Sequence, residues 1–161
     1  MNKESKTRVE DLLHEAMNAE IEAQKFYTRA AEKAQSSAGK TFFQELADFE
    51  QHHYTKIKGI IESRNKGVKL DVSKPEIAMK EIKAEVEGEF EPNKDEIVEV
   101  LTLGIKAEKE AQERYNKIAD HIDDPEGKEI FKELSEDERR HHDLLEAQYY
   151  QISNKGTIIW E

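Results

Sequence analysis

Two short stretches of the chain combine glutamate and histidine at a spacing that suits metal binding. Residues 50–53 read EQHH and residues 138–142 read ERRHH, so each stretch has a histidine three residues after a glutamate. On a helix these positions share one face, and both side chains can reach the same ion. Oxygen and nitrogen ligands without sulfur suit Fe(II), Mn(II) or Zn(II).

An internal repeat shows which residues of these stretches are equivalent. When the chain is shifted by 88 residues, 19–31 fall on 107–119 with seven of 13 positions identical, and 39–54 fall on 127–142 with seven of 16 identical. Such similarity predicts two helical hairpins of the same design that pack together.

The repeat selects one histidine from each stretch. His53 falls on His141, so these two are the predicted ligands. No other histidine is paired with a histidine by the repeat. The remaining histidines are predicted to be structural or solvent-exposed: His14, His52, His121 and His142.

The elements that would position these residues are long helices. The sequence predicts an all-α, antiparallel four-helix bundle in a single domain, 1–161. Glycine and proline are sparse, and capping patterns occur at Thr7, Asn93 and Asp124-Pro125. The helices are predicted at about 7–35, 38–64, 93–122 and 125–152. The stretch 65–92 is predicted to be a long crossover between the two hairpins, with one possible short helix at 75–83.

Each predicted helix places a glutamate on its buried face. Apolar residues recur at alternating spacings of three and four along the four helices, and a glutamate interrupts each series. At about 1.5 Å per residue, the four glutamates fall within one or two turns of a common level. They are Glu20, Glu50, Glu108 and Glu138.

Four carboxylates in an apolar interior cannot stay ionised unaided, because desolvation and repulsion would protonate them or push the helices apart. Two divalent ions would balance the four charges, with His53 and His141 as neutral ligands. Dinuclear carboxylate bundles use the same ligand set, in which two helices each provide one glutamate and the other two each provide Glu-x-x-His. Glu50 and Glu138 are predicted to bridge the metals, and Glu20 and Glu108 to bind one each.

Neighbouring polar residues are candidates for orienting these carboxylates. Tyr27 and Tyr115 lie seven residues after Glu20 and Glu108, on the same helix faces, and each could donate a hydrogen bond to a carboxylate ligand. Plain core packing is the alternative for both tyrosines. Gln24 and Gln112 are weaker candidates.

Composition excludes several classes of partner and site. A net charge of −11 argues against nucleic acid or an anionic membrane, and the absence of cysteine excludes thiolate sites. No apolar run resembles a signal peptide or a membrane span, so a cytoplasmic location is expected. The acidic run 85–91 is predicted to be a solvated loop. The apolar end, 157–161, could pack under the bundle or meet a second subunit.

With these motifs the chain resembles the rubrerythrin-like branch of the ferritin-like superfamily over residues 7–152. The resemblance rests on Glu20, EQHH at 50–53, Glu108 and ERRH at 138–141. It implies a di-iron centre that reduces hydrogen peroxide to water as the diferrous form becomes diferric. It also implies a homodimer.

Two features differ from typical rubrerythrins. The sequence has no cysteine for a rubredoxin-like domain, so the resemblance implies a separate electron-donor protein or reductase. Ala111 stands where those proteins carry a further glutamate, which leaves a ligand set similar to that of bacterioferritin centres. Three functions are therefore open: reduction of peroxide or dioxygen, ferritin-type iron binding with ferroxidase activity, and a non-catalytic bundle.

Overall fold

The computed structural model describes residues 3–67 and 88–159, with side chains from residue 9 onward. The possible short helix at 75–83 and most of the predicted crossover lie outside this range. The described residues contain two short strands, β1 (Glu89–Phe90) and β2 (Thr157–Ile158), and four long helices: α1 (Lys3–Lys33), α2 (Ser37–Lys66), α3 (Lys94–His121) and α4 (Pro125–Lys155). The predicted all-α four-helix bundle is confirmed.

The caps of α2 and α4 repeat the duplication seen in the sequence. Ser36 Oγ accepts a hydrogen bond from the amide three residues on (2.9 Å), and Asp124 Oδ1 accepts one from the amide two residues on (3.2 Å). These N-caps lie 88 residues apart. Both helices end at a glycine in the left-handed conformation, Gly67 (φ 68°) and Gly156 (φ 70°), where a side chain would be strained.

The start of α1 and the capping bond of α3 differ from the prediction. α1 begins at Lys3, ahead of the expected cap at Thr7, because no residue between them breaks a helix. The side chain of Asn93 makes no capping bond to α3. It donates instead to the Lys33 carbonyl (2.8 Å), which ties the start of α3 to the end of α1.

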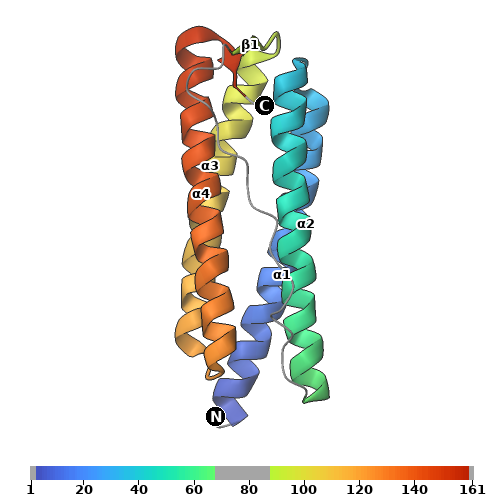
Figure 1. Cartoon of the computed structure of the whole chain (residues 1–161), viewed down its shortest axis with the longest axis vertical. Helices are drawn as coiled ribbons and strands as arrows, with labels where there is room; N and C mark the ends of the chain where they lie inside the picture. The colour runs from blue at the N-terminus through green and yellow to red at the C-terminus, as the bar shows by residue number, and fades with distance from the viewer. Residues whose placement is uncertain (1–2, 68–87, 160–161) are drawn as a thin grey trace.

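Each hairpin is one side of the bundle, with α1 beside α2 and α3 beside α4 (Figure 1). α1 and α4 run in one direction, and α2 and α3 run in the other. The two hairpins contact each other mainly through α1 and α3. Within the part of the chain that the structure describes, no helix combines the length and apolar character needed to cross a membrane.

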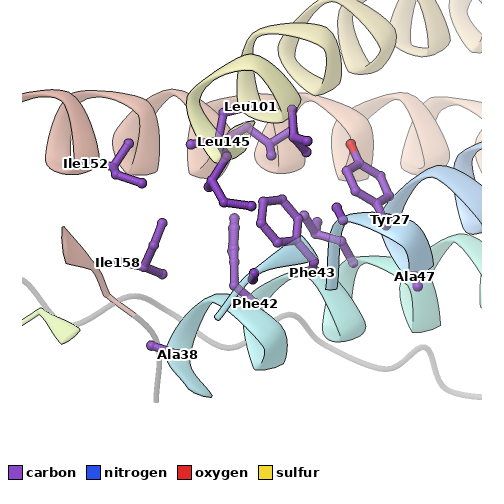
Figure 2. Close-up of a cluster of buried hydrophobic side chains, with 14 residues drawn as sticks. Tyr27, Ala38, Phe42, Phe43, Ala47, Leu101, Leu145, Ile152 and Ile158 are labelled. Carbon is purple, nitrogen blue, oxygen red and sulfur yellow. The ribbon is translucent and has the colours of Figure 1, made fainter. Parts of the chain in front are cut away.

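The apolar core is divided into two clusters. One lies toward the α1–α2 turn and includes Phe42, Phe43 and Leu145. Figure 2 shows Tyr27 at one edge of this cluster and Ile158 of β2 at the opposite edge. The second cluster lies toward the α3–α4 turn and includes Phe131 and its neighbours. A layer of buried polar residues separates the two clusters.

The C-terminal segment packs against the bundle as far as residue 159. β2 pairs antiparallel with β1, with Glu89 opposite Ile158. The side chain of Ile158 is fully buried, and the Ile159 amide donates to Gln148 Oε1 (3.1 Å). Of the two alternatives for 157–161, packing under the bundle is the one that the described residues adopt.

The prediction of a solvated loop at 85–91 is wrong at Glu91, which is fully buried. Its carboxylate accepts hydrogen bonds from the Ser36 hydroxyl (2.7 Å) and from the amides of Gln35 (3.0 Å), Ser36 (3.1 Å) and Asn93 (2.9 Å). The exposed Glu89 carboxylate accepts bonds from the amides of residues 37 and 38. The first amides of a helix lack partners within it, and Glu89 supplies them for α2. Glu91 instead ties the α1–α2 turn to the start of α3.

Candidate metal centre

Six buried side chains from all four helices meet in the polar layer at the middle of the bundle. α1 and α3 each contribute one glutamate, and α2 and α4 each contribute a Glu-x-x-His pair. Each of these side chains is only 1–2% exposed. The structure therefore brings together all six predicted ligands: Glu20, Glu50, His53, Glu108, Glu138 and His141.

The six residues form two overlapping groups that could each hold a metal ion. In each group, one ligand atom per residue lies within 4.8 Å of the others. The groups are Glu20, Glu50, His53 and Glu138, and Glu50, Glu108, Glu138 and His141. Glu50 and Glu138 belong to both. Two glutamates that bridge the metals would have to belong to both groups. Their role as bridges stays a prediction.

Several ligand atoms in the cluster have no hydrogen-bond partner among the described residues. They are Glu20 Oε2, His53 Nδ1, Glu108 Oε2 and Glu138 Oε1. His53 Nδ1 and Glu138 Oε1 lie 2.8 Å apart, but without the alignment of a hydrogen bond. Buried polar atoms rarely lack a partner. Unpaired oxygen and nitrogen atoms that converge on one point suit divalent cations, so the residues present fit a dinuclear metal site.

In the absence of a cation, protons balance the charge of the cluster. Burial, and then repulsion from Glu50, raise the pKa of Glu20 well above its usual range. Burial, followed by repulsion from Glu108 and Glu50, does the same to the pKa of Glu138. Burial alone would lower the pKa of His141, but the nearby carboxylates of Glu108 and Glu50 raise it to about 9. Cation binding is therefore expected to release protons.

The two tyrosines bond across the bundle rather than along their own helices. Tyr27 of α1 donates to Glu108 Oε1 of α3 (2.6 Å), and Tyr115 of α3 donates to Glu20 Oε1 of α1. Burial, and then the charge of Glu108, raise the pKa of Tyr27 well above its usual range, so its hydroxyl remains a donor. Of the two alternatives for the tyrosines, the structure shows hydrogen bonding to candidate ligands.

The weaker candidates do not reach the cluster. Gln24 Nε2 donates to Gln51 Oε1 (2.6 Å), and no side-chain hydrogen bond of Gln112 is found among the described residues. The remaining histidines also lie outside the six-residue cluster, on partly or fully exposed positions: His14, His52, His121 and His142. His142 lies beside Asp143 and Glu146 on the surface of α4.

Comparison with known proteins agrees with this geometry. A family model described as Rubrerythrin matches residues 11–149. The chain belongs to the rubrerythrin family. A solved structure of a hypothetical protein from Pyrococcus furiosus is similar to it with a TM-score of 0.71 and 28% sequence identity, covering 91% of this chain and 90% of that one. No curated protein matches the chain.

One residue around this rubrerythrin cluster was missed by sequence reasoning. His53 Nε2 lies 3.1 Å from Asp137 Oδ2, while His53 Nδ1 faces the glutamates. Asp137 is also bound by Arg140. Although burial acts to raise it, the pKa of Asp137 is lowered by its hydrogen bond to His53. A carboxylate on the outer nitrogen of a ligating histidine fixes the orientation of the ring.

The two histidines differ in this respect. Phe49 occupies the repeat position of Asp137, and its ring lies against His141 with a centroid distance of 5.5 Å. The outer side of His141 therefore faces an aromatic ring where His53 faces a carboxylate. The sequence held one sign of this role, because the repeat pairs the acidic Asp137 with the apolar Phe49. Asp137 lies one position off the buried face of its helix, so the periodicity did not select it.

We predict that Asp137→Asn weakens one metal position selectively. Loss of such a carboxylate typically costs ~10–100-fold in metal affinity, and the loss should fall on the ion bound through His53. Titration of the metal-free protein with Co(II), followed by absorbance, measures the two affinities. Asp143→Asn, an exposed acid on the same helix, is the control. Equal weakening of both positions would contradict the prediction.

A cavity of about 420 Å³ reaches the cluster from the side of α1 and α3. Its lining includes the four candidate glutamates but neither candidate histidine. Ala111, which stands where typical rubrerythrins carry glutamate, lines this cavity. The cluster is thus buried by its own helices yet open to small molecules on one side.

Proposed function

We propose that the chain binds two iron ions at the six-residue cluster and reduces hydrogen peroxide, or dioxygen, there. The observation that carries the proposal is the pair of overlapping ligand groups that share Glu50 and Glu138. Membership of the rubrerythrin family supports iron over manganese or zinc. Iron would supply the electrons that split an oxygen–oxygen bond.

The protein residues have distinct parts in this proposal. Glu50 and Glu138 would each contact both ions, since each carboxylate belongs to both groups. Tyr27 and Tyr115 orient Glu108 and Glu20 through their hydroxyl groups. The apolar clusters on either side keep bulk water from the layer, and the cavity between α1 and α3 admits the oxidant.

Electrons have to reach the cluster from elsewhere. The sequence contains no cysteine, so we propose that a separate electron-donor protein or reductase supplies them. A cytoplasmic location and a homodimeric state are further parts of the proposal, carried over from the resemblance.

A ferroxidase function is the second candidate. Ala111 leaves four glutamates and two histidines as the ligand set, which is similar to that of bacterioferritin centres. Such a protein would oxidise Fe(II) with dioxygen and go on to take up more iron than the cluster can hold.

Anaerobic loading with Fe(II), followed by desalting and stopped-flow mixing, tests these functions. We expect about two iron ions per chain and faster oxidation by hydrogen peroxide than by dioxygen, with turnover when a reductant is present. Protein loaded with Zn(II), which has no redox chemistry, is the control. Faster oxidation by dioxygen with continued iron uptake would favour the ferroxidase. Failure to retain iron would overturn both.

A further inference from the structure

The cavity between α1 and α3 is far larger than the oxidant that the centre is proposed to reduce. A water molecule takes up ~30 Å³ in the liquid, and a peroxide molecule has only two oxygen atoms. A volume of about 420 Å³ lies within the range of cavities that hold organic ligands, ~300–1,000 Å³. The cavity therefore has room for a molecule of another class.

The size of the cavity results from small residues at equivalent positions of the repeat. Ala19 and Ala107 form one such pair, and Ala23 and Ala111 form another. Phe26, Leu103 and the ring of Tyr27 add larger apolar surface. These walls suit a hydrocarbon chain or ring, since burial of apolar surface favours binding.

Arg114 lines the cavity, and the repeat pairs it with Phe26, so the two copies differ in chemistry at this position of the lining. Arg114 is half-buried, and it makes no hydrogen bond or ion pair with any residue that the structure describes. Its charge lowers the pKa of Glu20, against the larger effect of burial. A half-buried guanidinium without a partner is suited to a carboxylate, which it can bind through two hydrogen bonds.

The lining also includes the four buried glutamates of the cluster, whose charges two divalent ions would balance. The remaining charged residues of the lining are solvent-exposed. Glu22 pairs with Lys25 (3.7 Å), and Arg29 and Glu110 complete this group. Exposed charges contribute little to affinity because water and salt screen them. Arg114 is thus the charged group of the lining best placed to select a ligand.

We propose that this cavity binds an apolar organic monocarboxylate, with its carboxylate on Arg114 and its hydrocarbon part against the alanines beside the cluster. The proposal deepens the function given above, because the ligand would lie next to the dinuclear centre. Binding of the ligand does not depend on that function, and only a role of the ligand in the reaction would depend on it.

Octanoate is the probe, and isothermal titration of the full-length, Zn(II)-loaded chain measures its binding. We expect affinity to rise about fourfold for each methylene from butanoate to octanoate. Arg114→Gln should weaken octanoate binding at least tenfold, since it removes a hydrogen-bonded charge. Arg139→Gln, an exposed arginine on α4, should leave binding unchanged. Binding with the parent affinity to the Arg114→Gln variant would overturn the proposal.

Ala111→Leu and Ala23→Leu test the position of the hydrocarbon part independently. Each fills the cavity from one side, and each should abolish octanoate binding. Metal content and circular dichroism of the same samples identify any variant that fails to fold, so one folded variant suffices. Octanoate binding that survives in a folded variant overturns the placement.

Metal content also separates this inference from the proposed function. A parent chain that retains metal but does not bind octanoate overturns the inference alone. Sedimentation of that sample would show whether a second copy covers the cavity. A parent chain that retains no metal overturns the proposed function, and binding of octanoate to it would still support the inference.

Discussion

Replacement of Glu50 and Glu138 together by glutamine is expected to abolish binding of both metal ions and to leave the bundle folded. Each of these carboxylates belongs to both ligand groups, so their loss removes two anionic ligands from each ion. A neutral amide compensates a divalent cation poorly. Metal content after loading should fall from about two ions per chain to near zero.

Thermal unfolding gives a second measure of this variant. Binding to the folded state alone stabilises the parent by ~2.7 kcal/mol when free metal is 100 times its dissociation constant. For a chain of this size the melting temperature should rise by roughly 5–10 °C. The variant should show no such rise. Without metal it should be at least as stable as the parent, because two buried ionisable groups become neutral.

The matched control is the double substitution Glu45→Gln and Glu133→Gln. These glutamates lie on the same two helices, 88 residues apart, and neither belongs to the cluster. This control should load as much metal as the parent. Two retained ions in the Glu50 and Glu138 variant would show that the assigned ligands are wrong.

Glu91→Ala is expected to cause a loss of stability as large as truncation of a buried core side chain. The carboxylate is fully buried and accepts four hydrogen bonds, three from backbone amides near the α1–α2 turn and the start of α3. Alanine would leave buried donors without partners, at ~1–3 kcal/mol each before relaxation. A decrease of about 3–5 kcal/mol in the free energy of unfolding follows.

The same carboxylate predicts a dependence on pH. Burial acts to raise the pKa of Glu91, but hydrogen bonds from Ser36, Gln35 and Asn93 outweigh it and lower the pKa below its usual value. Its contribution to stability is therefore complete above about pH 4.3, the unfolded value. The contribution is lost as the pH falls through the lower pKa of the folded state.

Urea unfolding of the parent and of Glu91→Ala at pH 7 measures the loss of stability. The dependence on pH is measured by urea unfolding of the parent and of Glu91→Gln from pH 7 to pH 3. The difference between them should be constant down to about pH 5 and should shrink below about pH 4. Glu99→Gln, at an exposed position of α3, is the control. A difference that does not change across this range would rule out Glu91 as the titrating group.

The sequence predicted those parts of the structure that depend on local periodicity. The six-residue cluster follows from the recurrence of apolar residues along each helix and from the repeat, which aligns His53 with His141. For Tyr27 the correct face was predicted but not the partner. The spacing along α1 leaves the accepting carboxylate open, and the packing of α1 against α3 places Glu108 beside the hydroxyl.

The parts that could not be predicted depend on contacts between distant segments. Glu91 stands in an acidic run without helical periodicity, and its partners Gln35 and Ser36 lie more than 50 residues earlier. A buried cap of this kind gives no local pattern. Asp137 lies one residue off the buried face of α4, and only the approach of α2 brings His53 to it.

The repeat also has a consequence for what this site can become. Two separate, identical hairpins would have to place the same groups on both halves of a shared site. Two copies of the hairpin in one chain need not be identical, so a residue can be substituted in one copy and kept in the other. Both departures described here, Asp137 opposite Phe49 and Arg114 opposite Phe26, bring a charge into the second copy where the first is aromatic. Duplication therefore allowed one copy to keep the packing while the other took on polar chemistry.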